Sequence, residues 1–192
     1  MTWTQVSSLR LRNAPRAFKA LALGFVFSIS LAYLYALGNI VMVVGLTPKD
    51  IAVHYYGATT NITESPVASG EETINLEDLG EPSEAAPIAP GPRPSFKNLV
   101  GEGHFHLFGM SSFFFGLCLL ALFTGINETL KSFLVGGAFV FVVLDNISFM
   151  ATRFLGPKFA MMTAVSGGIM GLCFAGLWLS IVYELLQKKE LK

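Results

Sequence analysis

The stretch "SFLVGGAFVFVVLDNISFMAT", residues 132–152, decides the fold. It is long enough to cross the hydrocarbon core of a bilayer as a helix, which takes about 20 mostly apolar residues. Lipid offers the backbone no hydrogen-bond partners, so a spanning segment must pair its amides within itself. The whole chain has the same apolar character, with 53% hydrophobic and 14% charged residues among 192. Because an ordinary soluble domain is less apolar than this, the sequence predicts an integral membrane protein.

Three further segments have the length and hydropathy of a membrane span. The four expected spans are residues 20–45, 103–125, 132–152 and 159–185. Between and around them lie an N-terminal segment (1–19), a long loop (46–102) and a C-terminal tail (186–192). Short connections between the last three spans predict antiparallel neighbours. The expected fold class is therefore an all-α integral membrane protein, with four transmembrane helices in an up-and-down bundle and a long outer loop between helices 1 and 2.

The distribution of positive charge predicts the orientation of the bundle. Cations near the span ends favour the side of the membrane that holds the N-terminus, by eight to five. The inner ones are Arg10, Arg12, Arg16, Lys19, Lys131, Lys188, Lys189 and Lys192, and the outer ones are Lys49, Arg93, Lys97, Arg153 and Lys158. We therefore expect both termini in the cytoplasm, and a bacterial cytoplasmic (inner) membrane as the location.

The outer loop changes composition abruptly. Its residues 71–95, "EETINLEDLGEPSEAAPIAPGPRPS", are acidic and then proline-rich, with few side chains able to build a core. Such a segment is expected to be extended or disordered. It would serve as a solvated tether, with a docking strap for a partner protein as the alternative. Asn61, followed by Ile62 and Thr63, matches a glycosylation acceptor that matters only in a eukaryotic secretory pathway.

Small residues recur every four positions on two of the spans. In the first span they are Ala20, Gly24, Ser28, Ala32 and Ala36, and in the fourth they are Thr163, Gly167, Gly171 and Ala175. Small side chains let membrane helices approach closely. These two stripes are therefore expected to be packing faces, either within the chain or against a second membrane protein.

Two histidines stand at the start of the second span, in "GEGHFHLFGM", residues 101–110. Two positions along a helix amount to about 200° of rotation, so the rings of His104 and His106 should point to nearly opposite faces. One regular helix cannot bring both imidazoles onto one ion. The flanking glycines would let a flat macrocycle or another helix approach, and Glu102 could orient His106 or cap the span.

The segment "HFHLFGM" resembles the haem-ligand helix of haem-copper oxidase subunit I. In that family the two histidines of the motif point to opposite sides of the helix and ligate two different haems. The resemblance implies that His104 would ligate a high-spin haem and His106 a low-spin haem. It covers about ten residues, since this chain lacks the twelve spans and further histidines of that family, so we expect no match over the whole chain.

A cofactor within this one chain would need further ligands. His54 in the outer loop is the one other histidine, and the thioethers expected at a similar depth belong to Met110, Met150, Met161 and Met162. Imidazole and thioether groups suit haem b, and they equally suit copper, Cu(I) especially. The alternative is that no cofactor binds, because methionines also fill gaps between helices and an interfacial histidine can bond to water or headgroups.

Asp145 is an ionisable residue within the third expected span, where such residues are rare. It lies eight residues inward from Arg153, roughly 12 Å at 1.5 Å per residue. An aspartate near the bilayer centre costs about 2.5 to 3.5 kcal/mol, so it should face the bundle interior with a partner or carry a proton. A proton or ligand path from the outer surface through His104 or His106 to Asp145 is one interpretation. A buried polar knot that includes Asn146 and only fixes packing is the other.

Two functions follow from these observations. The first is a small haem- or copper-binding membrane subunit for electron transfer or redox sensing at the outer face. The second is a non-catalytic structural or assembly subunit of a larger membrane complex. We expect no enzymatic activity of the chain on its own. The expected partners are the lipid bilayer and other membrane subunits or a second copy in a homodimer, and the scattered cations argue against nucleic acid.

Overall fold

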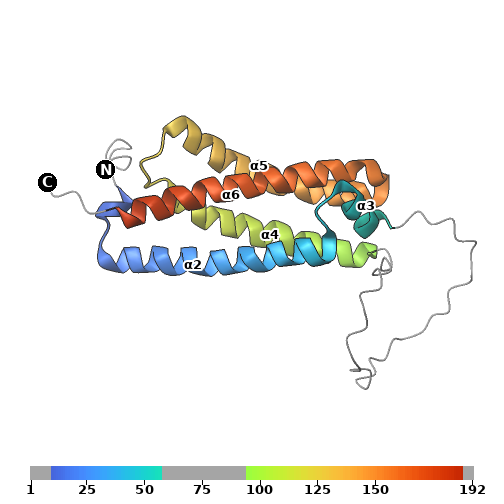
Figure 1. The fold of residues 1–192 in the computed structure, drawn as a ribbon, viewed down its shortest axis with the longest axis horizontal. Coiled ribbons are helices and arrows are strands. Elements are labelled where there is room, and N and C mark those ends of the chain that lie inside the picture. The colour runs from blue at the N-terminus through green and yellow to red at the C-terminus, as the bar shows by residue number, and fades with distance from the viewer. Residues whose placement is uncertain (1–9, 58–93, 188–192) are drawn as a thin grey trace, which may run out of the picture.

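The computed structural model describes residues 10–57 and 94–187, and within them the chain is helical throughout. Four long helices lie side by side in one elongated bundle (Figure 1). They are α2 (Arg16–Asn39, extended by the π-helical turn η2, Ile40–Val44), α4 (Phe96–Ala121), α5 (Glu128–Leu155) and α6 (Ala160–Leu186). The short elements are η1 (Leu11–Asn13), α3 (Pro48–Tyr56) and η3 (Pro157–Phe159).

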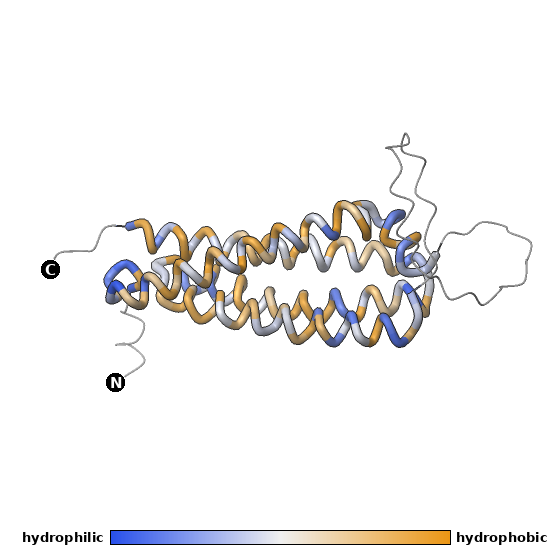
Figure 2. Tube along the Cα trace, turned by 90° about the horizontal axis from the view of Figure 1, so that it is seen from below, coloured by the Kyte–Doolittle hydropathy of each residue, from blue (hydrophilic) through white to orange (hydrophobic). Residues whose placement is uncertain are grey.

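All four long helices are long and apolar enough to cross a membrane, which confirms the expected fold class. Hydrophilic residues gather toward the two ends of the bundle, while its middle is largely hydrophobic (Figure 2). One end carries η1, the turn between α4 and α5, and the last turn of α6, and we call it the η1 end. The other carries α3, the start of α4 and the turn between α5 and α6, and we call it the α3 end.

The expected outer loop, residues 46–102, contains helical structure near both of its ends. It contains the helix α3, whose first turn is fixed by a capping box in which Thr47 and Asp50 each bond to the other's backbone amide. The helix α4 begins at Phe96 instead of residue 103, because Ser95 caps it by accepting from the amide of Asn98. Hydropathy misses these first two turns, in which Lys97, Asn98 and Glu102 lower the mean hydropathy. The acidic and proline-rich segment and the glycosylation motif lie almost wholly outside the described residues.

The core of the bundle runs along its middle and is built mainly from α4, α5 and α6. Its fully buried side chains include Phe114, Leu117, Val142, Leu177 and Ile181. The α5–α6 pair makes the most extensive contact, while α2 touches the others at few points. At one of these points the indole of Trp178 donates to the hydroxyl of Ser30 at 2.9 Å. The helix α2 is therefore the most lipid-exposed of the four.

The two stripes of small residues have different surroundings. On α6, a Cβ at Gly171 would lie 2.9 Å from the hydroxyl of Tyr33 on α2, so this glycine is a contact point within the chain. On α2 every member of the stripe is exposed, and nothing lies within 4 Å of a Cβ built at Gly24. The helix instead packs through Ala22, Val26 and Ile29. Contact of the α2 stripe with a partner stays a prediction.

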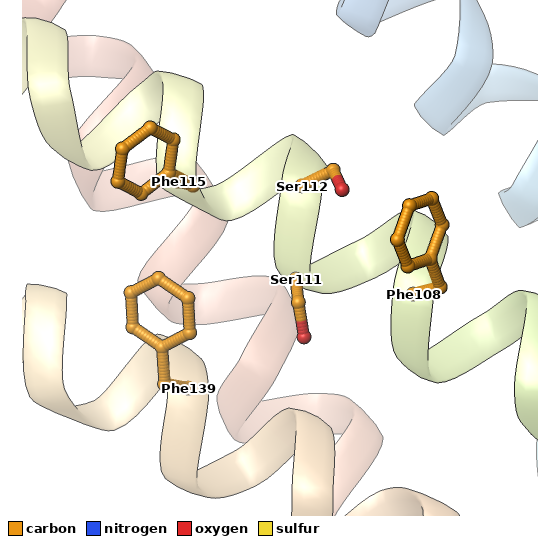
Figure 3. Close-up of a pocket in the computed structure, with 5 residues that line it drawn as sticks. All are labelled: Phe108, Ser111, Ser112, Phe115 and Phe139. Atoms are coloured by element: carbon orange, nitrogen blue, oxygen red, sulfur yellow. The ribbon is translucent and has the colours of Figure 1, made fainter.

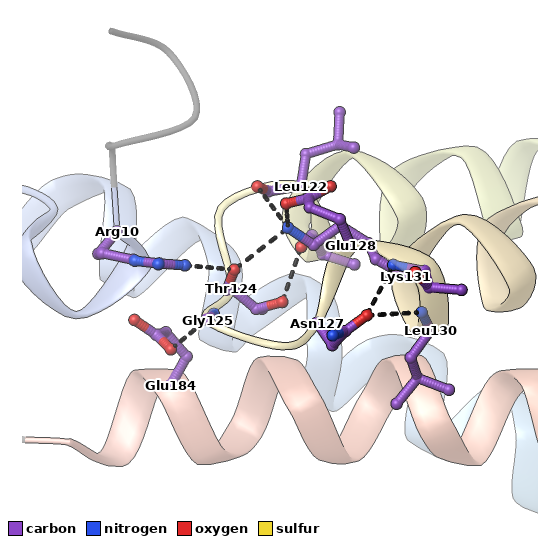
Figure 4. A network of polar contacts seen from close by, with 11 residues as sticks. Arg10, Leu122, Thr124, Gly125, Asn127, Glu128, Leu130, Lys131 and Glu184 are labelled. Carbon is purple, nitrogen blue, oxygen red and sulfur yellow. Dashed lines mark hydrogen bonds and ion pairs between the residues drawn. The ribbon is translucent and has the colours of Figure 1, made fainter. Parts of the chain in front are cut away.

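Polar contacts close the η1 end of the bundle (Figure 4). Lys131, only 4% exposed, directs its ammonium group to the carbonyl of Thr124 at 3.3 Å and to Glu128 at 2.8 Å. The guanidinium group of Arg10 donates to the same Thr124 carbonyl at 2.7 Å. Buried Glu184 accepts from the amide of Gly125 at 3.0 Å. Cations thus satisfy the free carbonyls after α4, at the negative end of its dipole.

The N-terminal segment is part of this closure. The amide of Leu11 donates to the carbonyl of Phe123 at 2.9 Å, and its side chain is 1% exposed. Arg12 lies 3.7 Å from a carboxylate oxygen of Glu184 and donates to Gln187 at 2.8 Å. Residues 10–13 are therefore anchored both to the α4–α5 turn and to the last turn of α6.

We predict that Gly116→Ala loosens the contact between α2 and α4. A Cβ at Gly116 would clash with the ring of Phe25, and such overpacking typically costs about 1–3 kcal/mol. Thermal denaturation in detergent should show a lower midpoint than for the unsubstituted protein. Gly24→Ala is the matched control on the exposed side of α2 and should leave the midpoint unchanged; equal midpoints for the two variants would contradict this packing.

We also predict that Lys131→Met destabilises the η1 end. The substitution keeps the apolar stem but leaves the Thr124 carbonyl with fewer donors, at a cost of about 1–3 kcal/mol. Hydrogen exchange should become faster in the last turn of α4 and the first turn of α5. The exposed cation Lys97, changed in the same way, should leave exchange at that end unaltered.

Candidate intramembrane polar site

His106 and Asp145 form a hydrogen-bonded pair inside the bundle. The Nε2 atom of His106, on α4, lies 3.1 Å from Oδ2 of Asp145, on α5. The side chain of Asp145 is 11% exposed and that of His106 is 33% exposed. Each residue faces the interior from the half of its helix nearer the α3 end. The carboxylate expected to need a partner within the membrane therefore has an imidazole as that partner.

The helix α6 supplies a second partner for the same carboxylate. The buried hydroxyl of Ser166 lies 3.0 Å from Oδ1 of Asp145, so each carboxylate oxygen has one close polar neighbour. Gly167, the next residue on α6, would place a Cβ 3.6 Å from Oδ1, at ordinary van der Waals contact, so α6 lies directly against the carboxyl group here. Three helices thus meet at one carboxyl group.

Further hydroxyls continue this polar region toward the α3 end. The hydroxyl of Ser148 donates to the backbone carbonyl of Asp145 at 2.7 Å, and that of Thr152 donates to the carbonyl of Ser148 at 2.8 Å. Thr152 also lies 3.4 Å from the hydroxyl of Thr163 on α6. The first two bonds satisfy hydroxyls within α5, and the Thr152–Thr163 contact joins α5 to α6.

A cap of aromatic side chains covers the pair at the α3 end. The ring of Phe149 meets that of His106 nearly at a right angle, with centroids 6.4 Å apart. Tyr55, from α3, stacks on Phe149 at 5.5 Å and is 6% exposed. Burial, followed by the negative charges of Glu102 and Asp145 and a hydrogen bond to Glu102, raises the pKa of Tyr55 well above its usual value. Tyr55 therefore remains a neutral phenol that can donate to Glu102.

His104 lies on a different face of α4 from His106. It is exposed, and its ring stacks on that of Phe108 with centroids 6.4 Å apart. The two imidazoles expected from the sequence therefore do not meet at one position. His54, on α3, packs edge-on against Tyr55 at 4.6 Å.

The candidate thioether ligands are also dispersed. Met110 is half-buried against the main core, Met150 packs beside Gly103, and Met161 is 58% exposed. Among residues 10–57 and 94–187, no three side chains of the His, Cys, Asp and Glu types gather where they could hold a metal ion. A haem iron on Nε2 of His106 would have to displace Asp145. Haem or copper on His104, His106, Met110, Met150 or Met161 stays a prediction.

Asn146 lies beside the pair but takes no part in it. Its amide nitrogen is buried without a hydrogen-bond partner in the described residues. Its oxygen would lie 3.0 Å from a Cβ at Gly103, where α4 and α5 come close. Asn146 also lines an apolar groove of about 530 Å³ between α4 and α5, together with Leu107 and Met150.

A second groove lies farther from the α3 end, on the same two helices (Figure 3). It has a volume of about 390 Å³ and is lined by Phe108, Ser111, Ser112, Phe115 and Phe139. Phe108 and Phe115 are 71% and 63% exposed. Both grooves therefore suit apolar chains at the bundle surface, and neither contains the His106–Asp145 pair.

The sequence interpretation missed Ser166 and Tyr55. Ser166 lies nine residues inward from Pro157 and Asp145 eight inward from Arg153, so the equal depth on adjacent helices was a usable signal. Tyr55 gave no such signal, since it lies in the expected outer loop, where no helix was predicted. Glu102 does not cap α4, which begins six residues earlier, but it lies one turn outward from His106 on the same face.

One family model matches most of the chain. It describes a transmembrane helical domain, the Aq_1264_TM family, and it matches residues 45–192, which begin after α2 and η2. No curated protein and no solved structure matches the chain.

This match corrects the sequence interpretation. The prediction that no family would match the whole chain, and that its likeness was to subunit I of the haem-copper oxidases, is wrong: the matching family is a different one, and no relation to those oxidases is shown. The chain belongs to the Aq_1264_TM family of transmembrane helical domains.

Proposed function

We propose that this membrane domain binds and releases a proton at the His106–Asp145 pair. The observation that carries the proposal is the 3.1 Å contact between an imidazole and a carboxylate inside a membrane bundle. Ionisable groups within spanning helices are costly and commonly belong to proton relays. Histidine is the side chain whose ordinary pKa lies closest to physiological pH. The pair thus unites a group able to exchange protons with a carboxylate able to accept one.

Proton exchange at the His106–Asp145 pair would change the contacts among three helices. With Asp145 ionised, both His106 and Ser166 can donate to it, and α4 and α6 are held to α5 through the carboxylate. With Asp145 protonated, one of its oxygens becomes a donor and the bonding pattern must change. Proton binding is thereby coupled to the packing of the bundle, which is the form that a signal to a partner subunit would take.

The proposed orientation places this pair near the outer face. The cations Lys131, Arg10 and Arg12 meet at the η1 end, and the positive-inside rule assigns that end to the cytoplasm. The α3 end then faces outward, in a bacterial cytoplasmic membrane. Partner subunits, or a second copy of the chain, remain expected on the exposed side of α2.

We predict that a proton-linked transition involves both members of the pair. Infrared difference spectra of the protein in lipid nanodiscs, recorded between acidic and neutral pH, should show a carboxyl band and imidazole bands changing together, since coupled groups titrate as one unit. Asp145→Asn should remove the carboxyl band, and His106→Gln should alter the same transition. The exposed neighbour His104→Gln is the control; loss of the transition in that variant alone would defeat the proposal.

The expected haem or copper gives a separate prediction. If one is bound through His106, the purified protein should show a visible spectrum that changes on reduction, with iron or copper at stoichiometric level. Because Asp145 contacts the same ring nitrogen, Asp145→Asn should then strengthen binding, whereas His106→Ala should abolish it. A featureless spectrum without either metal would remove the electron-transfer function and leave the proton proposal standing.

A further inference from the structure

Glu102 is placed between water and the His106–Asp145 pair. It precedes His106 by four residues on α4, a spacing that puts the two Cβ atoms about 5–6 Å apart on one face. Its side chain is exposed, whereas that of His106 is 33% exposed and points to Asp145. A carboxylate in contact with water thus stands one helical turn above an imidazole that is turned inward.

Tyr55 controls the other approach to the pair. Its ring stacks on Phe149, whose ring in turn meets that of His106. Tyr55 and Phe149 belong to a separate buried cluster at the α3 end, together with Ile51, Leu99 and Ala160. Tyr55 thereby covers Phe149 and, through it, one side of the imidazole.

The backbone holds α3 in this position. Gly45 has φ +89°, and a Cβ there would collide with the side chain of Asp50. Gly57 ends the helix with φ +100°. Positive φ is readily available to glycine alone, so both ends of α3 are sharp turns specified by the sequence. The placement of Tyr55 is therefore built into the chain on both sides.

We propose that protons enter the His106–Asp145 site through the carboxylate of Glu102, and that Tyr55 blocks the direct route for water. One proton from water protonates the Glu102 carboxylate. It then passes to the free nitrogen of the His106 ring, while the proton on Nε2 moves to Asp145. At the end Glu102 is again a carboxylate, His106 is neutral and Asp145 is protonated, so one proton has entered. This inference rests on the proposed proton function and names its entry residue.

The titratable and polar groups around the pair come from each of the packed elements. Asp145 on α5 contacts His106 directly, and Ser166 on α6 bonds to Asp145. Glu102 precedes His106 by four residues on α4, and Tyr55 on α3 lies close enough to Glu102 and Asp145 for their charges to raise its pKa. Tyr55 keeps its proton because its pKa is raised by burial. Glu102 is thus the titratable group of this set that both touches water and lies within a turn of His106.

The test measures the rate of proton uptake instead of its extent. After a rapid drop in pH, the growth of the Asp145 carboxyl band is followed by time-resolved infrared spectroscopy in nanodiscs. Glu102→Gln should slow this growth by about tenfold or more, in line with the effect of removing a positioned proton-transfer group, while the final amplitude remains. Glu102→Asp should retain most of the rate, and His104→Gln should retain all of it.

A double variant tests the role of Tyr55. Tyr55→Ala removes the ring that closes the α3 end, so adding it to Glu102→Gln should restore a fast rate by admitting water. An unchanged rate in Glu102→Gln, or no recovery in the double variant, would overturn the inference although the carboxyl band still forms. A protein without any carboxyl band after the pH change would instead refute the proposed function itself, so the two failures are distinguishable.

Discussion

A carboxyl group in hydrocarbon must find its hydrogen bonds inside the protein, and in this chain that requirement falls on Asp145. Its two oxygens are met by His106 of α4 and Ser166 of α6. Each of these contacts fixes the rotation of its helix, because turning α4 or α6 by one residue would carry the donor away from the carboxylate. The close approach at Gly167 and the position of Phe149 over the imidazole both depend on those rotations. One carboxyl side chain thereby sets the relative orientation of three helices.

The two ends of the bundle differ in the groups to which their charged side chains bond. At the η1 end, Lys131 and Arg10 bond to backbone carbonyls, and Glu184 bonds to a backbone amide. At the α3 end Arg153 likewise donates to a backbone carbonyl, that of Pro94, but His106, Asp145 and Ser166 bond to one another. One end is therefore closed around the α4 C-terminus, and the other carries a network of side chains that bond to each other. This asymmetry, more than the hydropathy of any span, distinguishes the two sides of the domain.

Much of the fold could be predicted from hydropathy, since a helix that crosses lipid needs length and apolar character above all. The inward position of Asp145 followed from the cost of burying its charge, and the divergence of His104 and His106 followed from helix geometry. The helix α3 could not be predicted in this way. It is short and its composition is mixed, and it is specified by the cap at Thr47 and by two glycines, not by a hydrophobic pattern. The site residue Tyr55 was missed with it.

The faces through which the helices contact one another could not be predicted from residue spacing either. The stripes on α2 and α6 have the same spacing of small residues, yet Gly171 contacts Tyr33 and Gly24 contacts nothing nearby. Such a stripe permits another helix to approach closely. The larger side chains on the neighbouring helix decide whether it does. The resemblance of about ten residues to an oxidase helix failed for a related reason, since local identity carries no information about what surrounds the two rings.

The anchoring of residues 10–13 has a consequence for biosynthesis. This segment is synthesised before the four long helices, but its contacts are with the α4–α5 turn and with Glu184 and Gln187 at the end of α6. The partners on α6 do not exist until the last of the four spans has been made and inserted. Residues 10–13 therefore complete their docking only after α6 is in place. A segment that precedes all four spans thus closes the η1 end after the last of them.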